Sequence, residues 1–257
     1  MILKRVAKGM RNQDWFVVFI EILIVVVGIF IGLQVDEWNE ASKQEATTKT
    51  YYLRIIEDLH SNDISRLSNV EYLQRTKQHA TSALNSLANN PETLGSQFII
   101  DLYQATQVWP YNIQRATYDE LLSGNIAKTI PDVKLRLKLS NYYLQIDTAK
   151  TFLMELTAYR ENIRGYIPHD LQSYVRENCG DAYDNSSDYD VVTLKNVCVL
   201  KMAPETSSNA VRDILTYSDL KKDLTYQISD NISKIDLLED YIPPIQPLVK
   251  YLDELGE

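Results

Sequence analysis

Near its N-terminus the chain reads Trp15-Phe-Val-Val-Phe-Ile-Glu21-Ile-Leu-Ile-Val-Val-Val-Gly28-Ile-Phe-Ile-Gly32-Leu-Gln34-Val35, an almost uninterrupted apolar run. From Phe16 to Val35 there are about 20 residues, enough for ~30 Å of helix, which is the thickness of a bilayer's hydrocarbon core. We therefore predict a single transmembrane anchor over residues 15–36. Trp15 and Trp38 lie just outside the run, where indole rings favour the membrane interface.

The charges that flank the run predict its orientation. Four basic residues precede it: Lys4, Arg5, Lys8 and Arg11. Three acidic residues follow it before the first lysine: Asp36, Glu37 and Glu40. The positive-inside rule then places a short tail, 1–14, in the cytoplasm and a domain, 37–257, on the other side of the membrane. In a bacterium with two membranes this predicts an inner-membrane protein with a periplasmic domain.

A cleavable signal peptide is the competing interpretation. It requires a shorter apolar region, followed by small residues at a cleavage site. The segment Gln34-Val-Asp-Glu-Trp-Asn supplies no such site, so we expect the anchor to stay uncleaved.

Glu21 is the one ionisable residue inside the run, and a carboxylate in hydrocarbon marks a candidate functional site. At 100° per residue, Glu21, Val25, Gly28 and Gly32 share one helix face. The Gly-x-x-x-Gly pair on that face allows close approach of another helix, either from a second copy or from another membrane protein. The alternative is that Glu21 reaches the cytoplasmic headgroups and that the glycine spacing arises by chance.

The composition excludes some classes of partner and chemistry. A net charge of −9 argues against nucleic-acid binding and against a basic surface that lies on anionic lipid. The two cysteines, Cys179 and Cys198, both fall in the predicted periplasmic part, so we expect a disulfide. On the chain-entropy model this loop closure contributes ~3 kcal/mol. A metal site at the cysteines is less favoured, since there is no Cys-x-x-Cys or neighbouring histidine.

Few glycines and prolines interrupt the remainder, and its apolar residues recur at helical spacing, so we predict an all-α fold. The expected helices cover 39–88 (possibly continuous with the anchor), 96–108, 113–123, 133–166, 168–177, 208–241 and 247–255. We expect Asn89-Asn90-Pro91 to end the first, Gly124 to form a C-cap and Asp132 an N-cap. Between the cysteines we expect a polar loop closed by the disulfide, with a small hairpin formed by 191–194 and 197–200. Packing of these helices predicts an antiparallel bundle.

Motifs of catalysis and cofactor binding are missing from the sequence. His60 with Asp63 and Glu57 offers a weak cation site, but a solvated histidine beside ordinary helix charges is the simpler interpretation. The acidic residues of 181–190 lack the spacing of a calcium loop. We expect the 17 tyrosines to lie mostly at the edge of the core, with a contact surface as the alternative. The sequence thus indicates no enzyme, no cofactor and no metal site.

The anchor, Glu21-Ile-Leu-Ile-Val-Val-Val-Gly28-Ile-Phe-Ile-Gly32-Leu-Gln34-Val-Asp-Glu-Trp38-Asn39-Glu40, resembles the N-terminal signature of a family of uncharacterised bacterial single-pass membrane proteins. The segment Tyr118-Asp-Glu-Leu-Leu-Ser-Gly124, with Arg136 and Tyr142-Tyr143, is similar to the family's second recurring stretch. The family more often has two asparagines where this chain has Asp36-Glu37. The resemblance implies no activity, but it implies that Glu21, Gln34, Trp38 and Asn39 act together at the membrane boundary.

Two hypotheses of function follow. The first is an interaction or scaffold protein whose anchor binds another membrane protein or a second copy, for example as an accessory subunit of a membrane complex. The second is a periplasmic sensor or small-ligand-binding bundle, which would signal through a partner because 14 cytoplasmic residues cannot form an output domain.

Overall fold

The computed structural model describes residues 15–88, 93–184, 191–195 and 197–256. The chain divides into two compact units, Met1–Leu53 and Arg54–Glu257, called here the first and second units. One helix, α2 (Trp15–Ser86), contributes residues to both. The predicted continuity of the anchor with the first long helix is therefore confirmed.

The first unit contains the apolar part of α2. In the described part of the chain, α2 is the one helix that is long and apolar enough to cross a membrane. Its large apolar side chains in this segment are almost all exposed, including Ile24 and Phe30. From Gly32 to Ser86 the helix contains no further glycine or proline, which explains why nothing interrupts it. The predicted stop at Asn89-Asn90-Pro91 lies outside the described residues.

The second unit is built mostly from helices that follow α2. They are α3 (Ser96–Gln104), α4 (Ala116–Ser123), α5 (Ile126–Thr129), α6 (Val133–Leu153), α7 (Ala158–Tyr166), α8 (His169–Cys179), α9 (Pro204–Leu215), α10 (Leu220–Asp236), a π-helical turn (Leu237–Tyr241) and α11 (Gln246–Gly256). Strands β1 (Ala182–Asp184) and β2 (Val191–Thr193) form an antiparallel hairpin in which Tyr183 is opposite Val192. The described residues are thus mostly helical, as predicted, and include a small hairpin.

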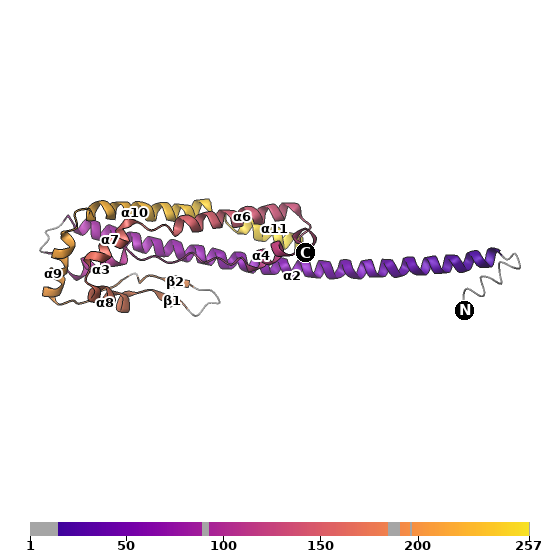
Figure 1. The fold of residues 1–257 in the computed structure, drawn as a ribbon, viewed down its shortest axis with the longest axis horizontal. Coiled ribbons are helices and arrows are strands. Elements are labelled where there is room, and N and C mark those ends of the chain that lie inside the picture. Colours follow the sequence, from indigo (N-terminus) through magenta and orange to yellow (C-terminus); the bar gives the residue numbers. More distant parts are fainter. Residues whose placement is uncertain (1–14, 89–92, 185–190, 196, 257) are drawn as a thin grey trace. The chain divides into compact units, whose positions relative to one another are not determined.

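Hydrogen bonds fix the directions of the three longest helices in the second unit. Along α2, Arg66 contacts Leu238 and Thr76 contacts Asn231, so α10 runs antiparallel to α2. Lys234 contacts Glu155 and Gln227 contacts Thr157. The chain that leaves α6 therefore also runs antiparallel to α10. In Figure 1, α6 and α10 lie on one side of α2 and the hairpin on the other. Because α2 and α6 run in the same direction, the arrangement differs from the simple antiparallel bundle that we predicted.

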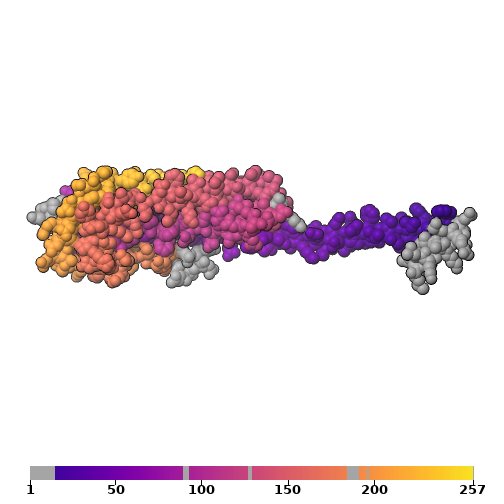
Figure 2. Space-filling view, in the orientation of Figure 1, coloured from indigo at the N-terminus to yellow at the C-terminus, as the bar shows by residue number. Residues whose placement is uncertain are grey.

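The main core lies where α2, α3, α7, α8, α9 and α10 meet. Fully buried tyrosines contribute much of its volume and that of neighbouring regions: Tyr72, Tyr103, Tyr111, Tyr143 and Tyr159. These tyrosines lie inside the core and not at its edge, which corrects the prediction for them. In the space-filling view, side chains of the later helices cover much of the α2 segment that belongs to this unit (Figure 2).

Two predicted long helices are each broken in two. The expected helix 133–166 ends at Leu153, because Thr157 is extended and its hydroxyl donates to the side-chain oxygen of Gln227. Phe152 and Leu156, two apolar residues of the expected helix, are each more than half exposed. The expected helix 208–241 is broken between α9 and α10, where the Thr216 hydroxyl donates to the Asp213 carbonyl over 2.6 Å. Such polar side chains compete with the helical backbone for hydrogen bonds.

Smaller differences concern helix ends and the hairpin. Helix α3 ends at Gln104 and not at Val108. Gly124 is the C-cap of α4, but in an extended conformation with φ −93°. Asp132 is the N-cap of α6, as predicted, and accepts a 2.5 Å hydrogen bond from the Leu135 amide.

Strand β2 pairs with residues 182–184 and not with 197–200 as predicted. Val192 and Leu194 are buried against Tyr72, whereas Val197 and Val199 are 76% and 74% exposed. Burial against α2 therefore selects the pairing.

Candidate functional site

The first candidate site is the helix face that begins at Glu21. Helix α2 is regular here, so Glu21, Val25, Gly28 and Gly32 lie within about 60° of arc on one face. A Cβ atom added at Gly28 or at Gly32 would meet no other atom within 4 Å. This face is therefore open in the structure, with a shallow surface at the glycines and the Glu21 carboxylate about two turns from Gly28 and three turns from Gly32.

The four predicted membrane-boundary residues do not form one cluster. Trp15 and Trp38 are 68% and 75% exposed and are separated by ~35 Å along the helix axis. Gln34 and Asn39 are also exposed. Asn39 lies five turns from Glu21 on the same face, whereas Gln34 and Trp38 project from other sides of the helix. The structure thus adds Asn39 to the Glu21 face.

Cys179 and Cys198 form the predicted disulfide, with their Cα atoms 5.6 Å apart. Cys179 ends α8, and its carbonyl accepts a 2.6 Å hydrogen bond from Gln104 on α3. Across the closed loop, the Lys195 ammonium donates to the Asn178 carbonyl over 2.7 Å. The disulfide therefore ties the hairpin segment to the end of α8 at the edge of the main core.

A polar groove of about 440 Å³ lies in the second unit between α2 and residues 112–117. Its lining is mostly charged or polar: Arg54, Glu57, Asp58, Ser61, Ser65, Asn112, Gln114 and Thr117. Ser65 donates to the Asn112 carbonyl over 2.7 Å, and Asp58 accepts from the Thr117 amide at the start of α4. Many of these groups thus fix the 112–117 segment on α2.

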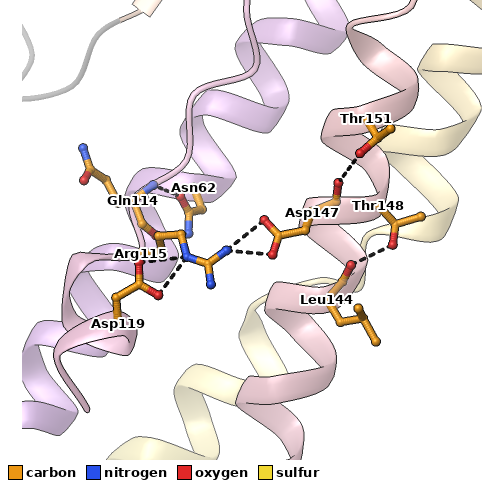
Figure 3. A network of polar contacts seen from close by, with 8 residues as sticks. All are labelled: Asn62, Gln114, Arg115, Asp119, Leu144, Asp147, Thr148 and Thr151. Atoms are coloured by element: carbon orange, nitrogen blue, oxygen red, sulfur yellow. Dashed lines mark hydrogen bonds and ion pairs between the residues drawn. The ribbon is translucent and has the colours of Figure 1, made fainter. Parts of the chain in front are cut away.

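Figure 3 shows the polar network beside this groove. Asn62 on α2 bonds both the amide and the carbonyl of Gln114, at 2.6 and 2.8 Å. The next residue, Arg115, binds Asp119 through Nε and holds both oxygens of Asp147 through Nη1, at 2.9 and 2.7 Å. The hydrogen bond to Asp147 is the main cause that raises the pKa of Arg115. This network joins α2, α4 and α6, and residues distant in sequence make it, so sequence spacing did not reveal it.

The histidines give no metal centre in the described residues. Asp63, which we paired with His60 in the sequence, makes a 2.8 Å ion pair with Arg66. Within the described ranges, no group of three or more His, Cys, Asp and Glu side chains is close enough to hold a metal ion. His79 instead makes a buried 2.8 Å contact with Asp101 on α3, which also accepts a hydrogen bond from Gln97. This buried pair was not predicted.

A second polar network crosses the bundle between α2, α10 and the turn after α6. Gln227 accepts from Thr157 and donates to Asn231 over 3.3 Å, and Asn231 donates to Thr76 over 3.2 Å. Nearby, Lys234 pairs with Asp230 at 2.8 Å and donates to the Glu155 carbonyl. The adjoining cavity measures about 20 Å³, which is room for one water molecule and not for a larger ligand.

One face of α6 is apolar and exposed. It carries Val133, Leu137 and Leu144, at spacings of four and seven residues, and each is more than half exposed. Figure 3 shows Leu144 pointing away from Arg115, while Asp147 points toward it. The second unit thus presents an exposed apolar face on α6.

Residues 21–158 match a family of unknown function (DUF6090), and this range is more than half of the chain. It contains the anchor from Glu21 onward, the groove and the network of Arg115. No curated protein and no solved structure matches the chain. The chain belongs to this family of unknown function.

Proposed function

We propose that this protein is a single-pass inner-membrane protein that acts by binding another membrane protein or a second copy of itself. Residues 1–14 form its cytoplasmic tail, 15–36 its anchor and 37–257 its periplasmic domain. The apolar segment of α2, the flanking charges and the cysteine pair support this location. A C-terminal alkaline phosphatase fusion is expected to be active, and an inactive fusion would contradict the orientation.

The observation that carries the binding role is the open face of α2 at Gly28 and Gly32. Small residues allow two helix backbones to approach, and van der Waals contact between them drives association in lipid. The carboxylate of Glu21 on the same face supplies a polar group that a partner helix satisfies by hydrogen bonding. The exposed apolar face of α6 supports a further contact outside the membrane.

The test uses Gly28→Leu, with Val26→Leu as the matched control. Both variants place leucine in the anchor, but Val26 lies about 160° around the helix from Gly28. We expect the native complex, solubilised in mild detergent, to be dispersed by Gly28→Leu and retained by Val26→Leu. Two differently tagged copies distinguish a second copy from another protein as the partner. Unchanged complexes in both variants would overturn the proposal.

The polar groove favours a second candidate, a small-ligand-binding bundle that signals through a partner. The lining of α2 and residues 112–117 suits a small polar molecule, because hydroxyl, amide and carboxylate groups converge there. Ser61→Phe fills the groove without altering the anchor. If ligand binding is the function, Ser61→Phe abolishes signalling through the partner in cells. The membrane complex of the first proposal should persist in this variant.

A further inference from the structure

Three arginines of the second unit converge on the C-terminal end of α3. Arg160 and Arg164 lie on α7 and Arg176 on α8, and both helices contact α3 (Figure 1). Arg160 donates to the Thr106 carbonyl, and Arg164 donates to the Thr106 hydroxyl over 2.8 Å. Arg176 donates to the Tyr103 hydroxyl over 3.2 Å, and the Arg164 guanidinium lies 5.0 Å from the centre of the Tyr103 ring. The two residues Tyr103 and Thr106 therefore hold three guanidinium groups in one place.

Among the residues that the structure describes, these positive charges have no carboxylate within ion-pair distance. Across residues 15–88, 93–184, 191–195 and 197–256, no ion pair within 4.0 Å involves any of the three arginines, although the chain carries a net charge of −9. The Asp181 carboxylate lies in the neighbourhood, where it accepts a 2.8 Å hydrogen bond from Tyr72, but it forms no ion pair within 4.0 Å with any of the three. The pKa of Arg164 is lowered, first by burial and then by the charge of Arg160. Within the described ranges, the cluster thus carries three positive charges and no direct ion pair.

Part of this arrangement has a structural explanation. The last carbonyls of a helix lack intrahelical partners, and cations near a helix C-terminus are favourable. Arg160 and Arg164 lie close to this end of α3, but they bond Thr106, which follows the helix. The last α3 carbonyls already accept from other groups, the amides of Ala105, Thr106 and Gln107 and the Tyr159 hydroxyl. Among the described residues Arg176 donates to the Tyr103 hydroxyl, and its side chain is exposed. Each guanidinium carries five N–H donors, and the hydrogen bonds described above use few of them.

We propose that Arg160, Arg164 and Arg176 bind an oxyanion of the phosphate class. Planar guanidinium groups match a phosphate bidentately, and a doubly charged oxyanion compensates the mutual repulsion of the cluster. Either free phosphate or the phosphate group of a larger molecule supplies this chemistry. The site is independent of the anchor face that carries the proposed function.

Thermal unfolding of the full detergent-solubilised chain tests the site, at constant ionic strength. The probes are inorganic phosphate and glycerol 3-phosphate, against chloride. We expect a rise in Tm of about 3 °C at ten times the Kd. A rise in Tm with inorganic phosphate identifies the free ion as the ligand. A rise in Tm with glycerol 3-phosphate at lower concentration identifies a phosphate monoester as the ligand.

Arg176→Gln should weaken binding about tenfold without changing the Tm in chloride, because this side chain is exposed. Arg176→Lys should weaken binding by an intermediate amount, since lysine keeps the positive charge but lacks the planar guanidinium that binds two oxygens at once. Arg212→Gln, which removes an exposed arginine on α9, is the control and should respond as the unaltered chain does. If neither probe raises the Tm, or if all variants respond equally as they would to a general salt effect, the proposal is overturned.

Discussion

Asn231 on α10 donates a 3.2 Å hydrogen bond to the hydroxyl of Thr76 on α2, and both residues are buried. Asn231 also accepts from Gln227, which is in turn bonded to Thr157 in the turn after α6. One buried asparagine therefore links three segments that are far apart in the sequence. A buried polar group without a partner is costly, so this chain of contacts specifies how α10 sits on α2.

Replacing Asn231 with alanine should destabilise the second unit by about 1–3 kcal/mol, because Thr76 and Gln227 each lose a buried partner. The free energy of unfolding, measured by denaturant titration in detergent, checks this. Ser229→Ala, at an exposed position of the same helix, should change it by less than about 0.5 kcal/mol. Equal effects of the two variants would show that the network contributes nothing.

The Arg115–Asp147 contact of Figure 3 should contribute less than the buried network, despite its good geometry. Both side chains are about a third to a half exposed, at 32% and 47%, so solvent screens the pair. Asp147→Asn is expected to cost less than about 1 kcal/mol, and its effect should shrink further in high salt. If Asp147→Asn lowered the free energy of unfolding more than Asn231→Ala does, the Arg115–Asp147 pair would contribute more than the buried network, which contradicts this expectation.

Removing the disulfide by the double change Cys179→Ser and Cys198→Ser should lower stability by ~3 kcal/mol, since the closed loop is constrained only when the bond is present. Thermal unfolding of the oxidised chain gives the measurement. Adding a reductant should lower the Tm of the unaltered chain and leave the double variant unchanged. A reductant effect on the double variant would place the cause elsewhere.

Tyrosines should make the protein unstable in alkali. Burial raises the pKa of Tyr72, Tyr143 and Tyr159 above the usual value, and burial together with a hydrogen bond to Asp223 raises the pKa of Tyr217 to about 12. The folded state holds these protons more tightly than the unfolded state. The stability is therefore complete below pH ~10 and falls as the pH rises above it.

Absorbance of tyrosinate and circular dichroism, recorded together during an alkaline titration, check this expectation. The buried tyrosines should ionise only when the helical signal is lost. Tyrosinate formation by all 17 tyrosines near pH 10 with the helices intact would contradict the burial described here.

Features that depend on local sequence were predictable. The absence of glycine and proline predicted the long run of α2, and Asp132 predicted the start of α6. The face shared by Glu21, Gly28 and Gly32 follows from helical spacing alone, so sequence was sufficient to find it.

Features that depend on distant contacts were not predictable. The break after Leu153 is stabilised by Gln227, some seventy residues later in the chain. The pairing of β2 depends on burial against Tyr72 of α2. The arginine cluster likewise forms only when α7 and α8 pack on α3, because nothing in the spacing of Arg160 and Arg176 indicates a common site.

The central claim, that the Glu21 face of the anchor contacts a partner helix, is tested most directly by site-specific photo-cross-linking in native membranes. A photoreactive residue at Val25 lies on that face, and one at Leu23 lies about 160° away. The account predicts a discrete adduct from position 25 and none from position 23. Equal adducts at both positions, or an adduct only from position 23, would contradict it.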